Sequence, residues 1–332
     1  MTLPMQPTLS ICIPTLNRCD FVCEAVRSIF DASWDASRVE VCISNNASEQ
    51  DYGALERLLA EAPESLRVHY RVQPERLTAD EHMFAVRHMA IAEHVYFLGD
   101  DDRFLQGQLP RLLDMIDRDS PDLAIFNGVL IDAANREIGR HLTLPSRTYA
   151  DVFDAFRDLR DKGMFGAVLV RASHLQDRHF KALFGTSHAY GCYWFSLLDS
   201  PAGQRAPAKI MIPDFPLVGL RVAAKTYSQL DVYYRQIPYE IAVYRRHLPS
   251  GAPQQANLRF EQGYERMISS LLFLTRMRFA GVAVRQIRDI HPGFYRRHAW
   301  KVRVADFLVE SGLYAGLQRL FHRLRGRTAR QA

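Results

Sequence analysis

Four short segments rich in apolar residues alternate with helical patterns over the first hundred residues. They are Leu9–Pro14, Val39–Ser44, Arg67–Val72 and His94–Gly99. Runs of this length, bounded by turn residues, predict strands. After the first run, Val22, Val26 and Ile29 recur at helical spacing. Because strands that alternate with helices form sheets covered on both faces, the pattern predicts an α/β fold with a largely parallel sheet.

Two of the predicted helices begin with capping patterns. Ser48 and Asp51 have the spacing of a helix N-cap and predict that the second helix starts there. Thr78 and Glu81 have the spacing of a capping box, in which each side chain bonds the other residue's backbone N–H. We expect this third helix to run to about Ala92.

The rest of the chain gives a mixed and then a helical pattern. Strands are expected at residues 121–132, 163–170 and 208–222. The polar span 133–148 is typical of a loop, and the aromatic-rich span 180–198 is expected to end in a helix. From about Asp231 the pattern is mostly helical, with a break at 247–254, where Pro and Gly cluster. We therefore divide the chain at residue 225, with a helical C-terminal region at 226–332.

The composition is that of an ordinary globular protein, with 48% hydrophobic and 24% charged residues among 332. The longest apolar run, Ile268–Thr275, is far shorter than the ~20 residues of a membrane span. The N-terminal residues lack a secretory leader, so we expect a cytoplasmic protein. The five cysteines are an odd number, and Cys12 and Cys42 lie inside apolar runs, which favours reduced thiols.

The positive charge is concentrated at the C-terminus. Residues 295–332 hold nine Lys and Arg and two acids, whereas the whole chain has a net charge of +5. Within 313–332, Leu and Phe share one helical face and arginines another. A basic amphipathic helix either contacts an anionic membrane surface, here at the inner membrane face, or docks on its own protein with the arginines in water. The sequence has no RNA-recognition motif beside this tail, so we expect no nucleic acid.

Three adjacent carboxylates, Asp100, Asp101 and Asp102, directly follow the fourth strand. Carboxylates this close repel one another, and a divalent cation reverses that cost. Magnesium commonly binds one or two carboxylates together with substrate phosphates. The pattern therefore fits a metal site that uses Asp100 and Asp102, or alternatively a solvated acidic turn or helix cap.

Polar clusters also follow the first two strands. They consist of Pro14, Thr15, Asn17 and Arg18, and of Asn45, Asn46 and Ser48. In parallel sheets, ligands bind at the carboxyl ends of strands. Amides and hydroxyls suit the base and ribose of a nucleotide, and Arg18 or Arg76 suits its phosphates. There is no phosphate-binding G-x-x-x-x-G-K loop and no G-x-G-x-x-G dinucleotide motif.

The segments LSICIPTLNRCDFVCEAVRSI, VEVCISNNASEQD and YFLGDDD, in this order, resemble the nucleotide-sugar domain of family 2 glycosyltransferases. ISNNAS and GDDD resemble the branch of O-antigen sugar transferases such as abequosyltransferases. The resemblance implies the A-type glycosyltransferase fold, with a catalytic domain at 1–225. In that domain, residues 8–132 would bind the nucleotide sugar and 133–225 the acceptor.

The resemblance also implies site residues. Pro14, Thr15, Asn17 and Arg18 would line the nucleotide pocket, and Asn45 stands where the family usually has a base-binding Asp, beside Asn46 and Ser48. Arg76 and His82 stand where asparagines are common, and Thr78 where glycine is common. Asp100 and Asp101 would face the ribose and diphosphate, and Asp102 would hold Mg2+ or Mn2+. The implied activity is a nucleotide-sugar-dependent transfer of hexosyltransferase type, with inversion, in surface polysaccharide synthesis on a glycan or lipid-linked acceptor.

The catalytic base is the point of departure from the family. Family members commonly have an acidic pair before an aromatic helix, whereas the corresponding segment here, Gly185–Trp194, contains no acid. His188 is the nearest group that takes a proton near neutral pH, or else a helix cap or packing residue. Asp177, Asp199 and Asp214 are further candidates. The nearby aromatics fit either a sugar platform or the core. Without a base, the chain would be a non-catalytic module that binds nucleotide sugar or nucleic acid.

Overall fold

The computed structural model describes residues 6–30, 34–199, 208–222, 228–316 and 318. The chain forms two compact units. The first comprises Met1–Ala224 together with His247–Gln254, and the second comprises Lys225–Arg246 and Gln255–Ala332.

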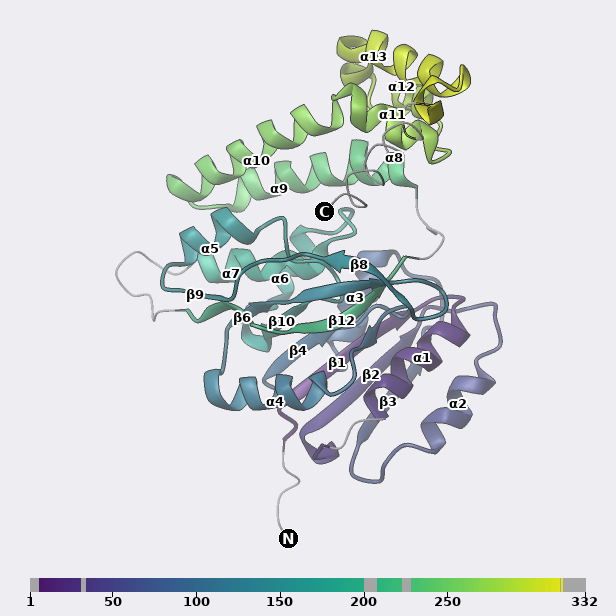
Figure 1. Ribbon diagram of the computed structural model, residues 1–332. Helices are drawn as coiled ribbons and strands as arrows, with labels where there is room; N and C mark the ends of the chain where they lie inside the picture. The colour runs from purple at the N-terminus through teal and green to yellow at the C-terminus, as the bar shows by residue number, and fades with distance from the viewer. Residues whose placement is uncertain (1–5, 31–33, 200–207, 223–227, 317, 319–332) are drawn as a thin grey trace, which may run out of the picture. The chain divides into compact units, whose positions relative to one another are not determined.

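The described residues of the first unit contain an eight-stranded sheet in the order β3-β2-β1-β4-β10-β6-β11-β9 (Figure 1). Its strands are β1 (Leu9–Thr15), β2 (Val39–Asn45), β3 (Arg67–Val72), β4 (His94–Phe97), β6 (Leu123–Ile125), β9 (Arg147–Tyr149), β10 (Val168–Arg171) and β11 (Ile210–Ile212). The first four are parallel, as predicted. The sheet as a whole is mixed, because β10 and β9 run antiparallel to their neighbours. The chain enters β10 beside the carboxyl end of β4, where Gly166 N donates to Phe97 O, and so must run back.

A second sheet of the first unit has the order β5-β12-β7-β8 among the described residues. Its strands are β5 (Arg103–Phe104), β12 (Pro216–Arg221), β7 (Asn127–Ile131) and β8 (Glu137–His141). Three predicted strands were wrong in extent. Of span 163–170, only the last three residues belong to a strand, β10. Span 121–132 splits into β6 and β7, and span 208–222 into β11 and β12, in different sheets. The span predicted as a loop, 133–148, contains β8 and the start of β9. An apolar run does not reveal that its two halves pair with different partners, and β8 is a polar edge strand.

Helices cover both faces of the large sheet in the first unit (Figure 1). On one face, α1 (Cys19–Phe30), α2 (Gly53–Ala60) and α4 (Gln108–Asp119) pack in one core with Leu9, Ile11 and Ile13 of β1. On the other, the Cys12 thiol donates to Val86 O of α3 (Ala79–Arg87) at 3.7 Å. Alternate residues of β1 thus face opposite layers, which explains its continuous apolar run. All five cysteines are buried and free.

The two capping predictions had different outcomes. Thr78 and Glu81 form the predicted capping box, although α3 ends at Arg87 rather than near Ala92. The prediction for Ser48 was wrong, because α2 starts at Gly53. The Ser48 hydroxyl instead accepts from Asn17 N at 2.9 Å, across two strand ends. A serine at a strand end has the same local signature as a helix cap.

The remaining helices of the first unit are short. They are η1 (Ala36–Arg38), α5 (Val152–Leu159), η2 (Ala172–His174), α6 (Asp177–Ala182), η3 (Ala189–Cys192) and α7 (Tyr193–Leu198). The aromatic residues that fitted either a sugar platform or the core are all less than 10% exposed; they are Tyr190, Tyr193, Trp194 and Phe195. They belong to the core.

The second unit is helical, as predicted. Its described elements, with the shared ends of α9 and α10, are α8 (Gln229–Asp231), the π-helix η4 (Val232–Gln236), α9 (Ile237–His247), α10 (Ala252–Ile268), α11 (Leu271–Phe279), η5 (Val284–Gln286), α12 (Ile287–Ile290) and α13 (Pro292–Glu310). The predicted break falls between α9 and α10. Most of the predicted amphipathic tail, residues 317 and 319–332, lies outside the described residues. Of the helices described, none is long and apolar enough to cross a membrane.

Candidate active site

The carboxyl ends of β1, β2 and β4 are adjacent in the sheet. Thr15 at the end of β1 pairs with Asn45 at the end of β2. On the other side of β1, Cys12 pairs with Phe97, and Leu98 N donates to Cys12 O. The polar segments that follow these three strands therefore start from one edge of the sheet. This is the edge at which open α/β sheets bind ligands.

Arg18 links the end of β1 to the aspartates that follow β4. Its Nη1 donates to Asp100 Oδ1 at 3.1 Å and to Asp101 Oδ2 at 2.7 Å. Tyr52 supports the same loop: its hydroxyl bonds Thr15 Oγ1 at 2.8 Å and accepts from Arg18 N at 3.2 Å. The guanidinium therefore lies between two carboxylates, in the position from which it can reach an added anion.

Burial disfavours the ionised form of two of the three aspartates. Asp100 and Asp102 are 8% and 7% exposed. Burial raises the pKa of Asp100 to about 6, against the pull of Arg18. Burial, with the negative charges of Asp101 and Asp100, raises the pKa of Asp102 to about 8. A cation placed here would stabilise the ionised carboxylates.

Asp102 lies in a cradle formed by two glycines. Its Oδ1 accepts from Arg221 N at 2.9 Å. A Cβ at Gly99 or at Gly166 would collide with Oδ2, and Gly166 also has a φ of 86°. Oδ2 has no hydrogen-bond partner among the described residues. The Arg221 backbone thus fixes Oδ1 of Asp102, and Oδ2 remains available to a ligand or a metal ion.

This donor set fits a hard divalent cation. It offers buried carboxylate oxygens, one of which lacks a proton donor. Nowhere in the described chain do three His, Cys, Asp or Glu side chains form a complete metal cage. Mg2+ and Mn2+ accept such incomplete sites, because substrate phosphates and water supply the other ligands. Asp102 and Asp100 are the residues that would hold the ion.

Arg221, at the end of β12, holds the aspartate loop in place. Its side chain is fully buried and stacks on the Phe21 ring at 4.8 Å. All five N–H groups of the guanidinium are used. They donate to the carbonyls of Asp101, Asp132 and Ala133 and to the side chains of Glu24 and Asn135, at 2.6 to 3.2 Å. With its backbone N–H on Asp102, one residue fixes both the path of this loop and the Asp102 carboxylate.

The strand-end amides are bonded to the backbone. Asn17 Oδ1 accepts from Glu49 N at 2.9 Å and Gln50 N at 3.3 Å. Asn46 exchanges two hydrogen bonds with Leu77, at 2.8 and 3.0 Å. Both amides therefore fix the loops that surround the sheet edge. Asn17 also has a φ of 53°, which asparagine tolerates better than most residues.

The Asn45 NH2 group and the Arg76 guanidinium differ from these amides, because neither bonds a backbone group of a described residue. The Asn45 amide donates to Tyr70 Oη at 3.1 Å, and its Oδ1 accepts from Ser48 N at 2.9 Å. Asn45 is 4% exposed, so its amide would reach a ligand only by exchanging the Tyr70 hydroxyl, a partner that is easier to replace than a backbone group. Arg76 is exposed and has no ion pair with any described residue. It directly precedes Leu77, which Asn46 ties to the end of β2.

His82, at a position the family comparison singled out, has a structural role. It is 5% exposed, and its Nε2 lies 2.9 Å from Ser44 O and 3.0 Å from Ser44 Oγ. Burial lowers the pKa of His82 to about 4. The ring is therefore neutral near pH 7 and donates to the Ser44 carbonyl.

We expect His82 to make the first unit sensitive to acid. Its pKa is lower in the folded than in the unfolded chain, so its contribution to stability is present above about pH 6.5 and is lost as pH falls toward 4. The difference corresponds to about 3 kcal/mol in the free energy of unfolding. His82→Gln should flatten the decline of stability between pH 6.5 and 4.5 in urea unfolding. His88→Gln, at an exposed histidine, is the control; equal slopes in wild type and His82→Gln would refute the assignment.

His188 lies in a loop that Asp80 holds from α3. The buried Asp80 carboxylate accepts three backbone N–H groups: Gly185 and Ser187 at 2.8 and 2.9 Å on Oδ2, and Ala189 at 3.0 Å on Oδ1. Ser187 has a φ of 61°, a strained conformation that these bonds stabilise. The loop 185–190 contains no acidic residue, and the Asp80 carboxylate of α3 holds its backbone in place.

The loop 185–190 adjoins the aspartate edge through Tyr190. The Tyr190 hydroxyl accepts from Phe165 N at 3.0 Å, and its ring lies 6.4 Å from that of Phe97, which ends β4. Gly166, one residue beyond Phe165, forms the cradle of Asp102. His188 is half-buried, with its ring 6.3 Å from Tyr190. The loop that carries His188 therefore lies beside the end of β4, the strand that the aspartates follow.

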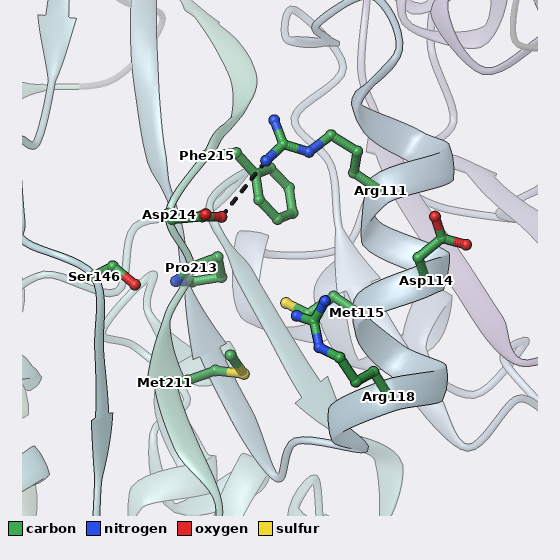
Figure 2. A pocket seen from close by; sticks show the side chains of 9 residues that line it. All are labelled: Arg111, Asp114, Met115, Arg118, Ser146, Met211, Pro213, Asp214 and Phe215. Carbon is green, nitrogen blue, oxygen red and sulfur yellow. Dashed lines mark ion pairs between the residues drawn. The ribbon is translucent and has the colours of Figure 1, made fainter.

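The three further candidates for the catalytic base, Asp177, Asp199 and Asp214, lie in ion pairs at the surface. Asp177 pairs with His88, and Asp199 with Arg178, and both side chains are more than half exposed. Asp214 lies at a separate pocket of about 320 Å3 between α4 and the β11–β12 connection (Figure 2). There it pairs with Arg111 at 3.5 Å, and Arg111 stacks on Phe215. None of the three has a hydrogen bond or ion pair to the aspartate triplet.

Four residues that shape the site lie outside the motifs visible in the sequence: Tyr52, Asp80, Gly166 and Arg221. None belongs to a local motif, because each acts on residues at least 34 positions away. Arg221 had one usable signal. An arginine at the end of an apolar strand, in PLVGLR, must be either exposed or fully paired.

The match to known families decides the assignment. A family model described as "Glycosyl transferase family 2" matches residues 10–177, just over half the chain. The chain belongs to glycosyl transferase family 2. The matched range contains β1 to β4, the aspartate triplet and Asp80. As a member of this family, the protein is a glycosyltransferase, and two of the similar structures described next are complexes with nucleotide sugars.

Solved structures that are similar to this chain confirm the predicted fold class. S. aureus TarS, residues 1–349, superposes with a TM-score of 0.59 at 13% identity, covering 93% of this chain and 92% of that one. The same protein in complex with UDP-GlcNAc gives a TM-score of 0.58 at 12% identity over 93% and 92%. The mannosyltransferase PcManGT from Pyrobaculum calidifontis, in complex with GDP-Man and Mn2+, gives 0.53 at 13% over 93% and 87%. A search of curated proteins finds no match.

Proposed function

We propose that this enzyme transfers a sugar from a nucleotide donor to a hydroxyl group of a glycan or lipid-linked acceptor. The observation that carries the proposal is the contact of Arg18 with Asp100 and Asp101 beside the cradled Asp102. This arrangement sets one arginine and three acidic side chains at the edge where α/β sheets bind nucleotides. The neighbours in complex with UDP-GlcNAc and with GDP-Man and Mn2+ support the donor class and a divalent cation.

We assign the donor contacts as follows. The Asn45 amide, released from Tyr70, bonds the edge of the base, and Asp100 bonds the ribose. Arg18 moves from the carboxylates to the diphosphate, with Arg76 on its other side. Asp102 would hold Mg2+ or Mn2+, and the bound ion would supply charge neutralisation for the departing diphosphate. Thr15, Asn17, Asn46 and Ser48 shape the pocket through the loops they hold.

For the acceptor, we propose that His188 takes the proton of the attacking hydroxyl, giving an inverting reaction. Asp80 fixes the loop and, as an anion, favours a protonated His188 after transfer. The absence of a carboxylate in this loop favours one alternative, a non-catalytic module that binds nucleotide sugar. A measurement of sugar transfer separates the inverting enzyme from the non-catalytic module.

We expect His188→Ala to lower kcat by roughly 10²-fold or more, the usual contribution of a general base. Asp80→Asn should lower kcat by about tenfold, because an amide NH2 would then oppose a backbone N–H. Donor Kd should stay unchanged in both. If Asp80 acts through His188, the double variant will be no slower than His188→Ala alone. Asp177→Asn is the matched control; additive losses would contradict the positioning role of Asp80.

The acceptor class rests on the resemblance of ISNNAS and GDDD to O-antigen sugar transferases. We propose on that basis a role in surface polysaccharide synthesis at the cytoplasmic side of the membrane. The basic tail, residues 313–332, would contact that membrane.

A thermal-shift screen tests the proposed function. UDP-, GDP-, CDP- and dTDP-sugars are added to the full-length protein with and without Mn2+. We expect one nucleotide class to raise the melting temperature, and more strongly with Mn2+. Bound donor without release of nucleoside diphosphate, over a range of glycan acceptors, would favour the non-catalytic alternative. No shift with any donor would contradict both.

A further inference from the structure

The most exposed large apolar side chains of the described residues lie on one face of α13. Phe307 is 61% exposed and Trp300 is 60% exposed. They are seven residues apart, and Arg296 and Arg303 alternate with them at helical spacing. Along this face the helix therefore presents arginine and aromatic side chains in turn. We call these four residues the α13 stripe.

The adjacent helix α11 has a similar face. Leu272 and Phe279 are 55% and 47% exposed, with the exposed Arg276 between them, and these three residues form the α11 stripe. Arg278 Nε on α11 donates to Asp306 Oδ1 on α13 at 2.8 Å. The opposite faces of the two helices share one core, through Leu274 and Met277 of α11 and Val302 and Ala305 of α13. Both stripes thus point away from the core that stabilises the unit.

The arginines of the stripes differ from their neighbours in pairing. Arg278 and Arg285 bond Asp306, and Arg297 bonds Glu265. In contrast, Arg276, Arg296 and Arg303 make no ion pair with any described residue. Asp306 and Glu265 therefore pair with arginines outside the stripes, and the charges of the stripe arginines are not neutralised by described residues.

We propose that the α11 and α13 stripes dock this enzyme on an anionic lipid surface. Arginines can bond lipid phosphates while Trp300 and Phe307 enter the boundary between headgroups and acyl chains. A second copy of the chain fits less well, because a two-fold contact through these faces would set arginine against arginine. The chain after Gln318 adds five arginines and no acid, which extends the same charge complementarity.

The proposal rests on the proposed function in one respect: it supplies the surface at which a lipid-linked acceptor would be met. Docking itself does not require catalysis. It also differs from the tail contact, because the stripes end before residue 313. Vesicle binding and donor binding can therefore fail separately.

The test is co-sedimentation of the full-length protein with vesicles of phosphatidylglycerol and phosphatidylcholine, 1:1, and with phosphatidylcholine alone. We expect binding only to the mixed vesicles. The variants Trp300→Ser/Phe307→Ser and Arg276→Gln/Arg296→Gln/Arg303→Gln should each weaken this binding at least tenfold. The control Ile91→Ser/Ile138→Ser, at apolar residues of the first unit that are 53% and 55% exposed, should not weaken it. Vesicles should shift the tryptophan emission to the blue in wild type and not in Trp300→Phe.

Three outcomes would overturn the proposal. They are no binding to mixed vesicles, stripe variants that bind as wild type does while deletion of 319–332 abolishes binding, and a dimer in light scattering that Trp300→Ser/Phe307→Ser dissociates. Donor-induced thermal shifts should be the same in wild type and stripe variants. Vesicle binding without any donor shift would leave docking intact and remove the proposed function.

Discussion

Asp102→Asn is expected to abolish sugar transfer while leaving the fold intact. The change keeps the shape of the side chain, so Arg221 N still finds an oxygen to bond. It removes one negative charge from the site proposed to hold the cation that neutralises the leaving diphosphate. Charge stabilisation of this kind contributes several kcal/mol, so we expect a loss of about 10³-fold in turnover. The measurement is nucleoside diphosphate release from the donor that gives the largest thermal shift.

The melting temperature separates this effect from unfolding. Because Asp102 is buried beside two other carboxylates, the neutral amide should leave the melting temperature of the donor-free protein unchanged or higher. Asp117→Asn, at a carboxylate that is 56% exposed and paired with Arg38, is the matched control. Full turnover in Asp102→Asn would remove this residue from the proposed chemistry.

Arg221→Met is expected to cause the largest loss of stability in the first unit, about 3 to 5 kcal/mol. Breaking a buried ion pair leaves its partner charge uncompensated, and here Glu24 would remain beside several unpaired carbonyls. Transfer should also fall, because the backbone around Asp101 loses its anchor. Urea unfolding followed by the emission of the buried Trp194 measures the stability.

Two variants frame the Arg221 result. Arg118→Met removes an arginine that is 71% exposed and should cost less than about 0.5 kcal/mol. Arg221→Lys keeps the charge and loses the fork of five donors, so we expect an intermediate loss. A loss in Arg221→Met no larger than in Arg118→Met would show that the buried network does not anchor the loop.

Sequence patterns located the strands and helices of residues 8–132 better than those of residues 133–225. β1, β2 and β4 are parallel strands marked by an apolar run and a polar end, and the helix after β3 is marked by the capping box of Thr78 and Glu81. Beyond residue 120 the strands are short, and neighbours in sequence such as β6 and β7 enter different sheets. Pairing between distant segments decides this, and no local pattern encodes it.

The same distinction applies to the site. The strand-end clusters were visible because each is contiguous, as in Asp100 to Asp102. The residues that hold them were not, because Asp80 meets the loop of His188 from 105 positions away, and Arg221 meets Asp102 from 119. The lack of an acid in that loop was read correctly from the sequence. Only the fold reveals that the Asp80 carboxylate bonds the backbone of this loop.

We propose above all that the aspartate edge binds a divalent cation together with the donor diphosphate. Electron paramagnetic resonance of Mn2+ titrated with the protein, with and without the nucleoside diphosphate of the preferred donor, tests it most directly. We predict weak binding of Mn2+ alone, at least tenfold tighter binding with the diphosphate, and loss of that gain in Asp102→Asn. Mn2+ binding that is unaffected by both the diphosphate and the substitution would contradict the account.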